Sequence, residues 1–173
     1  MATSPALLNP SSIGPRRDVR GEWLPVAFAI LFICFTSTAF MGGSHTQIWI
    51  GYVWRGLVGQ WHYAAVGTVN EVGRKVGHFL GYGTIGLLFR KAWYTSIRAY
   101  ALAVRSQWMF ISATLGVGST FVLASLDEWH QTFLPGRVGC LSDVLLDTVG
   151  ALFLNLALWA VYAYRRRKAL NSW

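Results

Sequence analysis

One stretch of the chain, residues 127–150, concentrates polar side chains of kinds that bind ligands or transfer protons. It lies between two long apolar runs. Ionisable side chains are costly at or inside a bilayer boundary, so such residues between apolar runs indicate a functional site. Carboxylates and histidine suit acid–base chemistry, and arginine suits the binding of carboxylate or phosphate. The polar residues of the stretch are Asp127, Glu128, His130, Gln131, Arg137, Asp143 and Asp147.

The spacing of these residues predicts which of them share a helix face. Asp127 and Gln131 are four positions apart and lie on one face, whereas Glu128 points about 100° away from Asp127. Asp143 and Asp147 repeat the four-residue spacing at the start of the next apolar run. We therefore expect two polar faces at neighbouring helix ends.

A second polar group precedes this stretch. Lys75, His78, Tyr82 and Gly86 follow one another at steps of three, four and four. At 100° per residue they fall within an arc of about 80°, which is one stripe of a helix. Polar groups on such a stripe should face protein or a water-filled cavity, although Lys75 and Tyr82 also fit plain interface positions. Gly150 is expected to let another helix approach closely.

Three accounts of these polar groups remain open. The first is a structural ion-pair network that holds three helices together, although buried pairs are often neutral for stability. The second is a polar pocket for a charged or zwitterionic head group. The third is a divalent cation on oxygen ligands, for which the spacing is not diagnostic, so no metal site or cofactor is assigned. The candidate ligand-binding residues are Lys75, His78, Tyr82, Asp127, Glu128, Gln131, Arg137, Asp143 and Asp147.

The composition places these residues in a membrane protein. The chain has 173 residues, of which 54% are hydrophobic and 13% charged, and its mean hydropathy is +0.40. Soluble domains are about 25% charged, so this chain lacks the polar residues to cover a water-facing surface. The net charge of +8 comes from basic clusters beside apolar runs, and no nucleic-acid motif accompanies them. Cys34 and Cys140 are predicted to be free thiols.

Apolar runs predict an all-α membrane protein of about four transmembrane helices. A span needs about 20 apolar residues. Residues 42–74 are too polar to span and rich in aromatic residues, so we expect an interfacial or re-entrant helix, with a plain loop as the alternative. For the first apolar run, the alternative to a span is a cleavable signal peptide. The expected spans are 23–41, 76–89, 107–126 and 143–164, within one transmembrane domain, 23–164. It lies between a disordered basic tail, 1–22, and a basic C-terminal tail, 165–173.

Basic residues predict the orientation of these spans. They gather in the N-terminal tail, in a loop at 90–106 and in the C-terminal tail, which alternate correctly for four spans. Lysine and arginine favour the cytoplasmic side. Both termini are therefore expected in the cytoplasm, and the polar residues at the outer face of the membrane.

The ordered set of polar motifs resembles the VanZ-like membrane protein family over roughly residues 70–160. Each motif alone is weak, and the set is more specific. The resemblance implies a multi-span protein of the bacterial inner membrane, and the family's namesake raises resistance to the glycopeptide teicoplanin. The motifs are Lys75-x-x-His78-Phe79-x-x-Tyr82, Asp127-Glu128-x-x-Gln131, Pro135-Gly136-Arg137 and Ser142-Asp143-x-x-x-Asp147-x-x-Gly150.

Two positions depart from the family pattern. Arg74 stands where the family often has an acidic residue before the lysine, and Asp147 stands where it usually has asparagine. The second change adds a charge near the membrane. That charge either alters what the pocket prefers or pairs with Lys75 or Arg74.

Three functions follow as hypotheses. The first is a VanZ-type envelope protein without a defined catalytic activity, which affects lipoglycopeptide tolerance. The second is a membrane enzyme acting on a lipid-linked phosphate head group, with Glu128, His78 and Asp127 as catalytic candidates. The third is a structural or partner-binding module. The expected partners are the lipid bilayer and a lipid or glycopeptide-related head group, with no nucleic acid, and the oligomeric state is left open.

Overall fold

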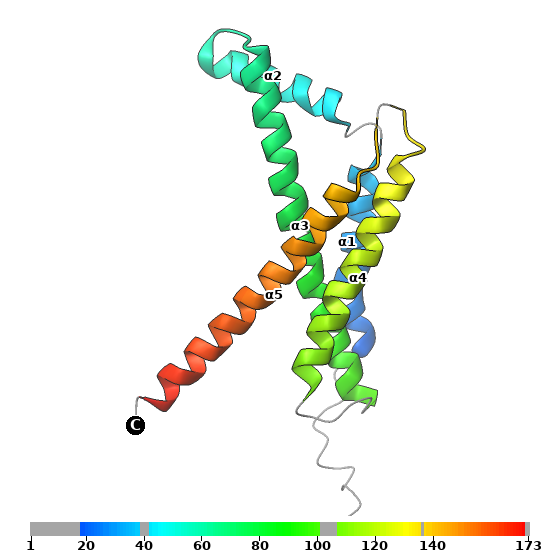
Figure 1. Cartoon of the computed structure of the whole chain (residues 1–173), viewed down its shortest axis with the longest axis vertical. Coiled ribbons are helices and arrows are strands. Elements are labelled where there is room, and N and C mark those ends of the chain that lie inside the picture. The colour runs from blue at the N-terminus through cyan, green and yellow to red at the C-terminus, as the bar shows by residue number, and fades with distance from the viewer. Residues whose placement is uncertain (1–17, 39–41, 101–106, 136, 172–173) are drawn as a thin grey trace, which may run out of the picture.

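The computed structural model describes residues 18–38, 42–100, 107–135 and 137–171. Within these ranges the chain is helical, which confirms the all-α class. The helices are α1 (Val19–Thr36), α2 (Gly43–Val58), α3 (Tyr63–Tyr100), α4 (Trp108–Gln131) and α5 (Leu141–Leu170) (Figure 1).

Helix α3 is the centre of the fold, because it contacts each of the other four helices. Helices α1 and α4 lie beside its lower part in Figure 1, and α5 crosses it and diverges toward the C-terminus. Helix α2 packs against the beginning of α3 at the upper end of Figure 1. Helix α1 begins, and α5 ends, toward the lower end, whereas the α4–α5 connection lies at the upper end.

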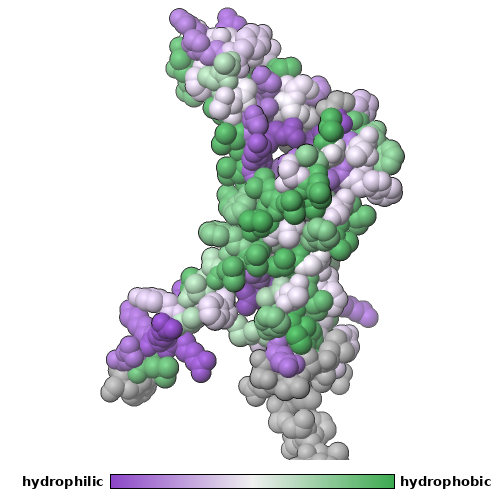
Figure 2. All heavy atoms as spheres, in the orientation of Figure 1, coloured by the Kyte–Doolittle hydropathy of each residue, from purple (hydrophilic) through white to green (hydrophobic). Residues whose placement is uncertain are grey.

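Three of the described helices, α1, α4 and α5, are long and apolar enough to cross a membrane. Figure 2 shows a hydrophobic band across the middle of the molecule, between hydrophilic groups at its upper end and lower left. This band and the three helices indicate a membrane protein. Helix α3 combines the apolar run at 76–89 with charged residues on both sides of it, and its role as a fourth span stays a prediction.

The bounds of α3 correct the sequence prediction. Its 38 residues extend about 57 Å at a rise of 1.5 Å per residue. Residues 90–100 were expected in a basic loop but continue the helix, because no proline interrupts it and Arg90 is buried. The Arg90 Nη1 donates to Oδ1 of Asn155 on α5 (3.4 Å). The rest of that predicted loop, 101–106, lies outside the described residues.

The segment 42–74 is helical, so the plain-loop alternative is wrong. It contains α2 and the first turns of α3, joined by a turn in which Gly59 has a φ of 77°. That left-handed conformation favours glycine.

The N-terminal region also differs from the prediction, since α1 begins at Val19 rather than Trp23. Its N-cap is Asp18, whose side chain accepts a hydrogen bond from the Arg20 amide (3.0 Å). Residues 1–17 and 39–41 lie outside the described residues.

Glycines allow α3 to cross its neighbours closely. A Cβ on Gly150 would lie 2.2 Å from the Phe79 carbonyl oxygen, and one on Gly116 would lie 2.9 Å from the Gly86 carbonyl oxygen. A larger residue at either position would push two helix backbones apart. The expectation that Gly150 permits a close approach is thus confirmed, and α3, α4 and α5 form one tightly packed unit.

Helix α1 joins this unit at its beginning through Trp23. The ring lies edge-on to Phe89 (centroids 6.2 Å apart) and Trp93 (5.2 Å apart) on α3. Its Nε1 donates to Oγ of Ser96, also on α3 (3.1 Å). The other end of α1 is held by the polar groups described next.

Candidate functional site

The Asp127 carboxylate joins three helices at the upper end of the bundle. Its Oδ2 accepts from the Tyr82 hydroxyl on α3 (2.9 Å) and from Nε2 of Gln131 one turn later on α4 (2.9 Å). Its Oδ1 accepts from the hydroxyl of Ser37, the C-cap of α1. Asp127 is 8% exposed, so these hydrogen bonds replace water around the carboxylate.

Glu128 fixes the connection between α4 and α5. Its Oε2 accepts from the Cys140 amide (2.8 Å), and its Oε1 accepts from Nε2 of Gln131 (3.3 Å). A Cβ on Gly139 would lie 2.2 Å from the Glu128 carbonyl oxygen, so the connection passes directly over the end of α4. These contacts give Glu128 a positioning role.

Arg137 reaches from this connection back to α1. Its Nη1 donates to Oε1 of Gln131 (3.1 Å), and its Nη2 donates to the carbonyl oxygens of Thr36 (3.2 Å) and Thr38 (3.3 Å). Carbonyls at a helix end lack intrahelical partners, so the guanidinium caps α1. Burial, followed by the neighbouring Arg74 guanidinium, lowers the pKa of Arg137. Arginine nevertheless stays protonated in proteins, and Arg137 therefore brings a positive charge to this end.

Asp147 meets His78 rather than either basic residue expected to pair with it. Nδ1 of His78 lies 3.3 Å from Oδ1 and 3.4 Å from Oδ2 of Asp147, which is fully buried on α5. The His78 ring also stacks on Tyr82, with centroids 5.9 Å apart and an 18° angle between the planes. Lys75 instead pairs with the exposed Glu71 at 2.9 Å, because that residue is one helical turn away.

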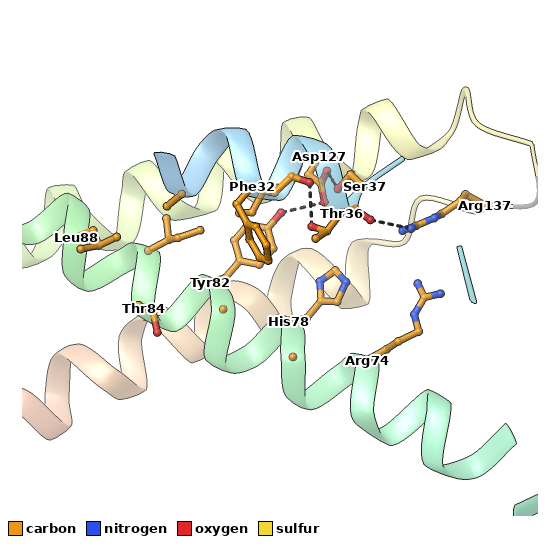
Figure 3. A pocket seen from close by; sticks show the side chains of 15 residues that line it. Phe32, Thr36, Ser37, Arg74, His78, Tyr82, Thr84, Leu88, Asp127 and Arg137 are labelled. Carbon is orange, nitrogen blue, oxygen red and sulfur yellow. Dashed lines mark hydrogen bonds between the residues drawn. The ribbon is translucent and has the colours of Figure 1, made fainter. Parts of the chain in front are cut away.

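A cavity of about 550 Å³ lies between α1 and α3 beside these contacts. Its volume falls within the range of about 300–1,000 Å³ that is usual for ligand sites. Figure 3 shows its walls, with polar side chains near one end and apolar side chains toward the other. The polar and charged lining residues near that end are Ser37, Arg74, His78, Tyr82, Asp127 and Arg137; the apolar ones include Ala29, Phe32, Ile33, Ile85 and Leu88.

A smaller hollow of about 280 Å³ adjoins this cavity between α3 and α5. Arg74 and His78 line both hollows. Lys75 and Asp143 line only the smaller one, and Glu128 lines neither. The structure thus gathers His78, Tyr82, Asp127, Glu128, Gln131, Arg137 and Asp147 into one connected group and leaves Lys75 and Asp143 at its edge.

Most residues that line the cavity were absent from the sequence-based site, and Ser37, Arg74, Gly77 and Gly81 are among them. Ser37 has no local signal, because its partner Asp127 is 90 positions away. Arg74 was noted as a departure from the family pattern but not as a cavity residue. Gly77 and Gly81 line the cavity and are four positions apart on α3. Their spacing, next to Gly73, was a signal that sequence reasoning passed over.

The arrangement favours binding over a recognisable nucleophile–base pair. Among the described residues, no group of three or more histidine, cysteine, aspartate or glutamate side chains is placed to hold a metal ion. Of the three catalytic candidates, His78 and Asp127 line the larger cavity and Glu128 does not. Ser37 also lines it, with its hydroxyl directed to Asp127. The cavity wall therefore offers cations and hydrogen-bonding groups to a charged ligand.

Comparison with known proteins gives one match. The family model described as VanZ/LLP1 matches residues 16–162. Neither a curated protein nor a solved structure matches the chain. The matched range includes the beginnings of all five helices and every residue of the polar group. It ends at residue 162, before the last turns of α5.

Replacing Asp127 by alanine should destabilise the fold. The change leaves the Tyr82 hydroxyl, the Gln131 amide and the Ser37 hydroxyl without their buried acceptor, at a cost of about 1–3 kcal/mol. The melting temperature of the protein in detergent should fall. Glu71→Ala is the control, because its exposed pair with Lys75 contributes only about 0–1 kcal/mol. Equal melting temperatures for the two variants would contradict this role of Asp127.

Proposed function

This chain belongs to the VanZ/LLP1 family, and from that membership we propose that it is a bacterial inner-membrane protein that affects tolerance to teicoplanin and related lipoglycopeptides. In this proposal the cavity between α1 and α3 lies at the outer face and binds the charged head group of an envelope component. The observation that carries the proposal is the pair of cations, Arg74 and Arg137, on the wall of a ligand-sized cavity.

The distribution of basic residues supports this orientation. Lys91 and Arg98 lie on the lower half of α3, and the last turns of α5 carry 165–168, which are all basic. Both groups lie toward the end at which α1 begins (Figure 1). Basic residues favour the cytoplasm, so the cavity's polar residues and the α4–α5 connection belong at the outer face.

The hydrogen bonds around the cavity support binding rather than a purely structural role. Asp127 and Gln131 have their partners within the protein, and Arg137 is held against α1 by two carbonyl groups. The walls are thus set in place before a ligand arrives, which lowers the ordering cost of binding. A network that only held helices together would not need a cavity of about 550 Å³ next to it.

Cys140 should react with a membrane-impermeant maleimide added to intact spheroplasts. It is exposed and is the N-cap of α5, at the end of the α4–α5 connection, whereas Cys34 is exposed along the apolar α1. The Cys34→Ser variant isolates the Cys140 signal. As a control for the opposite side, Arg166→Cys in a chain lacking both native cysteines should react only after permeabilisation. Labelling of Cys140 only after permeabilisation would reverse the orientation.

Expression of the chain should raise the teicoplanin tolerance of a sensitive bacterium, and Arg74→Gln or Arg137→Gln should remove most of that increase. Each variant deletes a cation from the cavity wall. Lys91→Gln is the matched control, because Lys91 pairs with Glu22 at the other end of the bundle (2.9 Å). The readout is the minimum inhibitory concentration at equal membrane levels of each protein. Unchanged tolerance with wild type, or equal protection by all forms, would refute the proposal.

A further inference from the structure

The cavity between α1 and α3 has ends of opposite chemistry. Figure 3 shows Arg74 and Arg137 extending toward one another at one end, with Phe32 and Leu88 at a distance from them. Ile33 and Ile85, both buried, belong to the apolar part. A ligand that matches both ends carries an anionic group and a hydrocarbon segment.

The polar end is built for an anion that accepts several hydrogen bonds. Arg74 comes from α3, where its Nη1 lies 2.6 Å from the position of a Cβ on Gly43, and Arg137 comes from the α4–α5 connection. The Arg74 guanidinium repels that of Arg137, and an anion between the two groups relieves that repulsion. The planar fork of arginine matches the geometry of phosphate oxygens. The Asp127 carboxylate at the same wall already accepts three hydrogen bonds from the protein.

The cavity also opens sideways toward the region where lipid would lie. Phe32 is 67% exposed, and the lining residues Gly77, Gly81 and Thr84 are exposed as well. Helix α1 is held at its beginning by Trp23 and at its end by hydrogen bonds to Asp127 and Arg137. The middle of α1 also packs on α3, through a core that includes Val26, Ile33 and Ile85. The lateral opening lies beside this core, where Phe32, Gly77 and Gly81 are exposed.

Two glycines keep this opening clear. A Cβ added to Gly77 or Gly81 would meet nothing within 4 Å, unlike one on Gly150, which would meet a helix backbone. Glycine inside a helix costs about 1 kcal/mol relative to alanine. Close helix packing explains that cost at Gly150 but not at Gly77 or Gly81. The space beside these two residues suits a chain passing between α1 and α3.

We propose that the cavity binds a membrane lipid with a phosphate head group, which lies between Arg74 and Arg137 while its hydrocarbon chain leaves past Gly77 and Gly81 into the bilayer. This inference rests on the proposed function, because it names the head group that the cavity takes. A volume of about 550 Å³ holds a head group and the first part of one chain, and the remainder of the chain stays in the membrane.

The test is binding of a fluorescent long-chain prenyl phosphate to the full chain in phosphatidylcholine nanodiscs. The matching prenyl alcohol, inorganic phosphate and phosphatidylglycerol serve as competitors. Wild type should bind the prenyl phosphate. Arg74→Gln should weaken binding by about tenfold or more, since a hydrogen bond to a charged group is worth about 1.5–3 kcal/mol. Gly81→Leu should weaken binding because its side chain fills the space through which the hydrocarbon chain leaves. Gly118→Leu is the matched control, because a Cβ there also meets nothing within 4 Å but Gly118 does not line the cavity.

Each outcome decides the proposal. Wild-type binding that both cavity variants weaken supports it, and competition by phosphatidylglycerol extends the class to phosphate diesters. Absence of binding by wild type would overturn it, as would equal competition by prenyl alcohol or by inorganic phosphate. Equal binding by Arg74→Gln, Gly81→Leu and wild type would also overturn it. Melting temperatures identify a misfolded variant, and Thr84→Leu on the same wall then replaces Gly81→Leu. Lipid binding without any change in teicoplanin tolerance would refute only the proposed function.

Discussion

The Asp127 carboxylate imposes the constraint on which the rest of this fold depends. It is 8% exposed at the end of an apolar helix, where a charge without hydrogen-bond donors would cost several kcal/mol. Its donors come from three helices: Ser37 ends α1, Tyr82 lies on α3, and Gln131 ends α4. Satisfying one carboxylate therefore sets the distance and register of three helices at the same end. Arg137 completes the arrangement by capping the carbonyl groups of α1.

The cavity is a consequence of how α1 is attached. Helices α3, α4 and α5 cross closely because residues such as Gly116 and Gly150 leave no side chain between the backbones. Helix α1 instead packs on α3 through larger side chains, which include Trp23, Val26 and Ile33, and its end is bonded to Asp127. The exposed Gly77 and Gly81 line the cavity beside this contact. Glycine thus serves two purposes. On α4 and α5 it allows close packing against α3, and on α3 Gly77 and Gly81 leave space at the cavity wall.

The sequence predicted correctly those features that depend on neighbouring residues of the same segment. Apolar runs located α1, α4 and α5, and the four-residue spacing of Asp127 and Gln131 placed both on the face where they bond to each other. It was misleading at residues 90–100, where basic side chains suggested a loop although they sit on a continuous helix. Contacts between distant segments had no sequence signal: Arg137 donates to the Thr36 carbonyl across 101 positions.

Competition between neighbours decides the ion pairs at this end of the bundle. Lys75 was grouped with the site because it shares a stripe with His78 and Tyr82, yet Glu71 lies one turn away and pairs with it. For Asp147, pairing with Lys75 or Arg74 was one of two alternatives. The residue meets His78 instead, because the α3–α5 crossing brings that ring to within 3.3 Å of the carboxylate. Charge and spacing alone do not choose between such partners, since the choice depends on how closely the helices cross.

The central claim is that the cavity between α1 and α3 opens to lipid and ends at two arginines. A structure determined in lipid nanodiscs tests this claim most directly. We predict that α1 stays joined to Asp127 at its end, with elongated density that passes Gly77 and Gly81 and ends between Arg74 and Arg137. Helix α1 packed flat against Gly77 and Gly81, with no space between the helices, would contradict it.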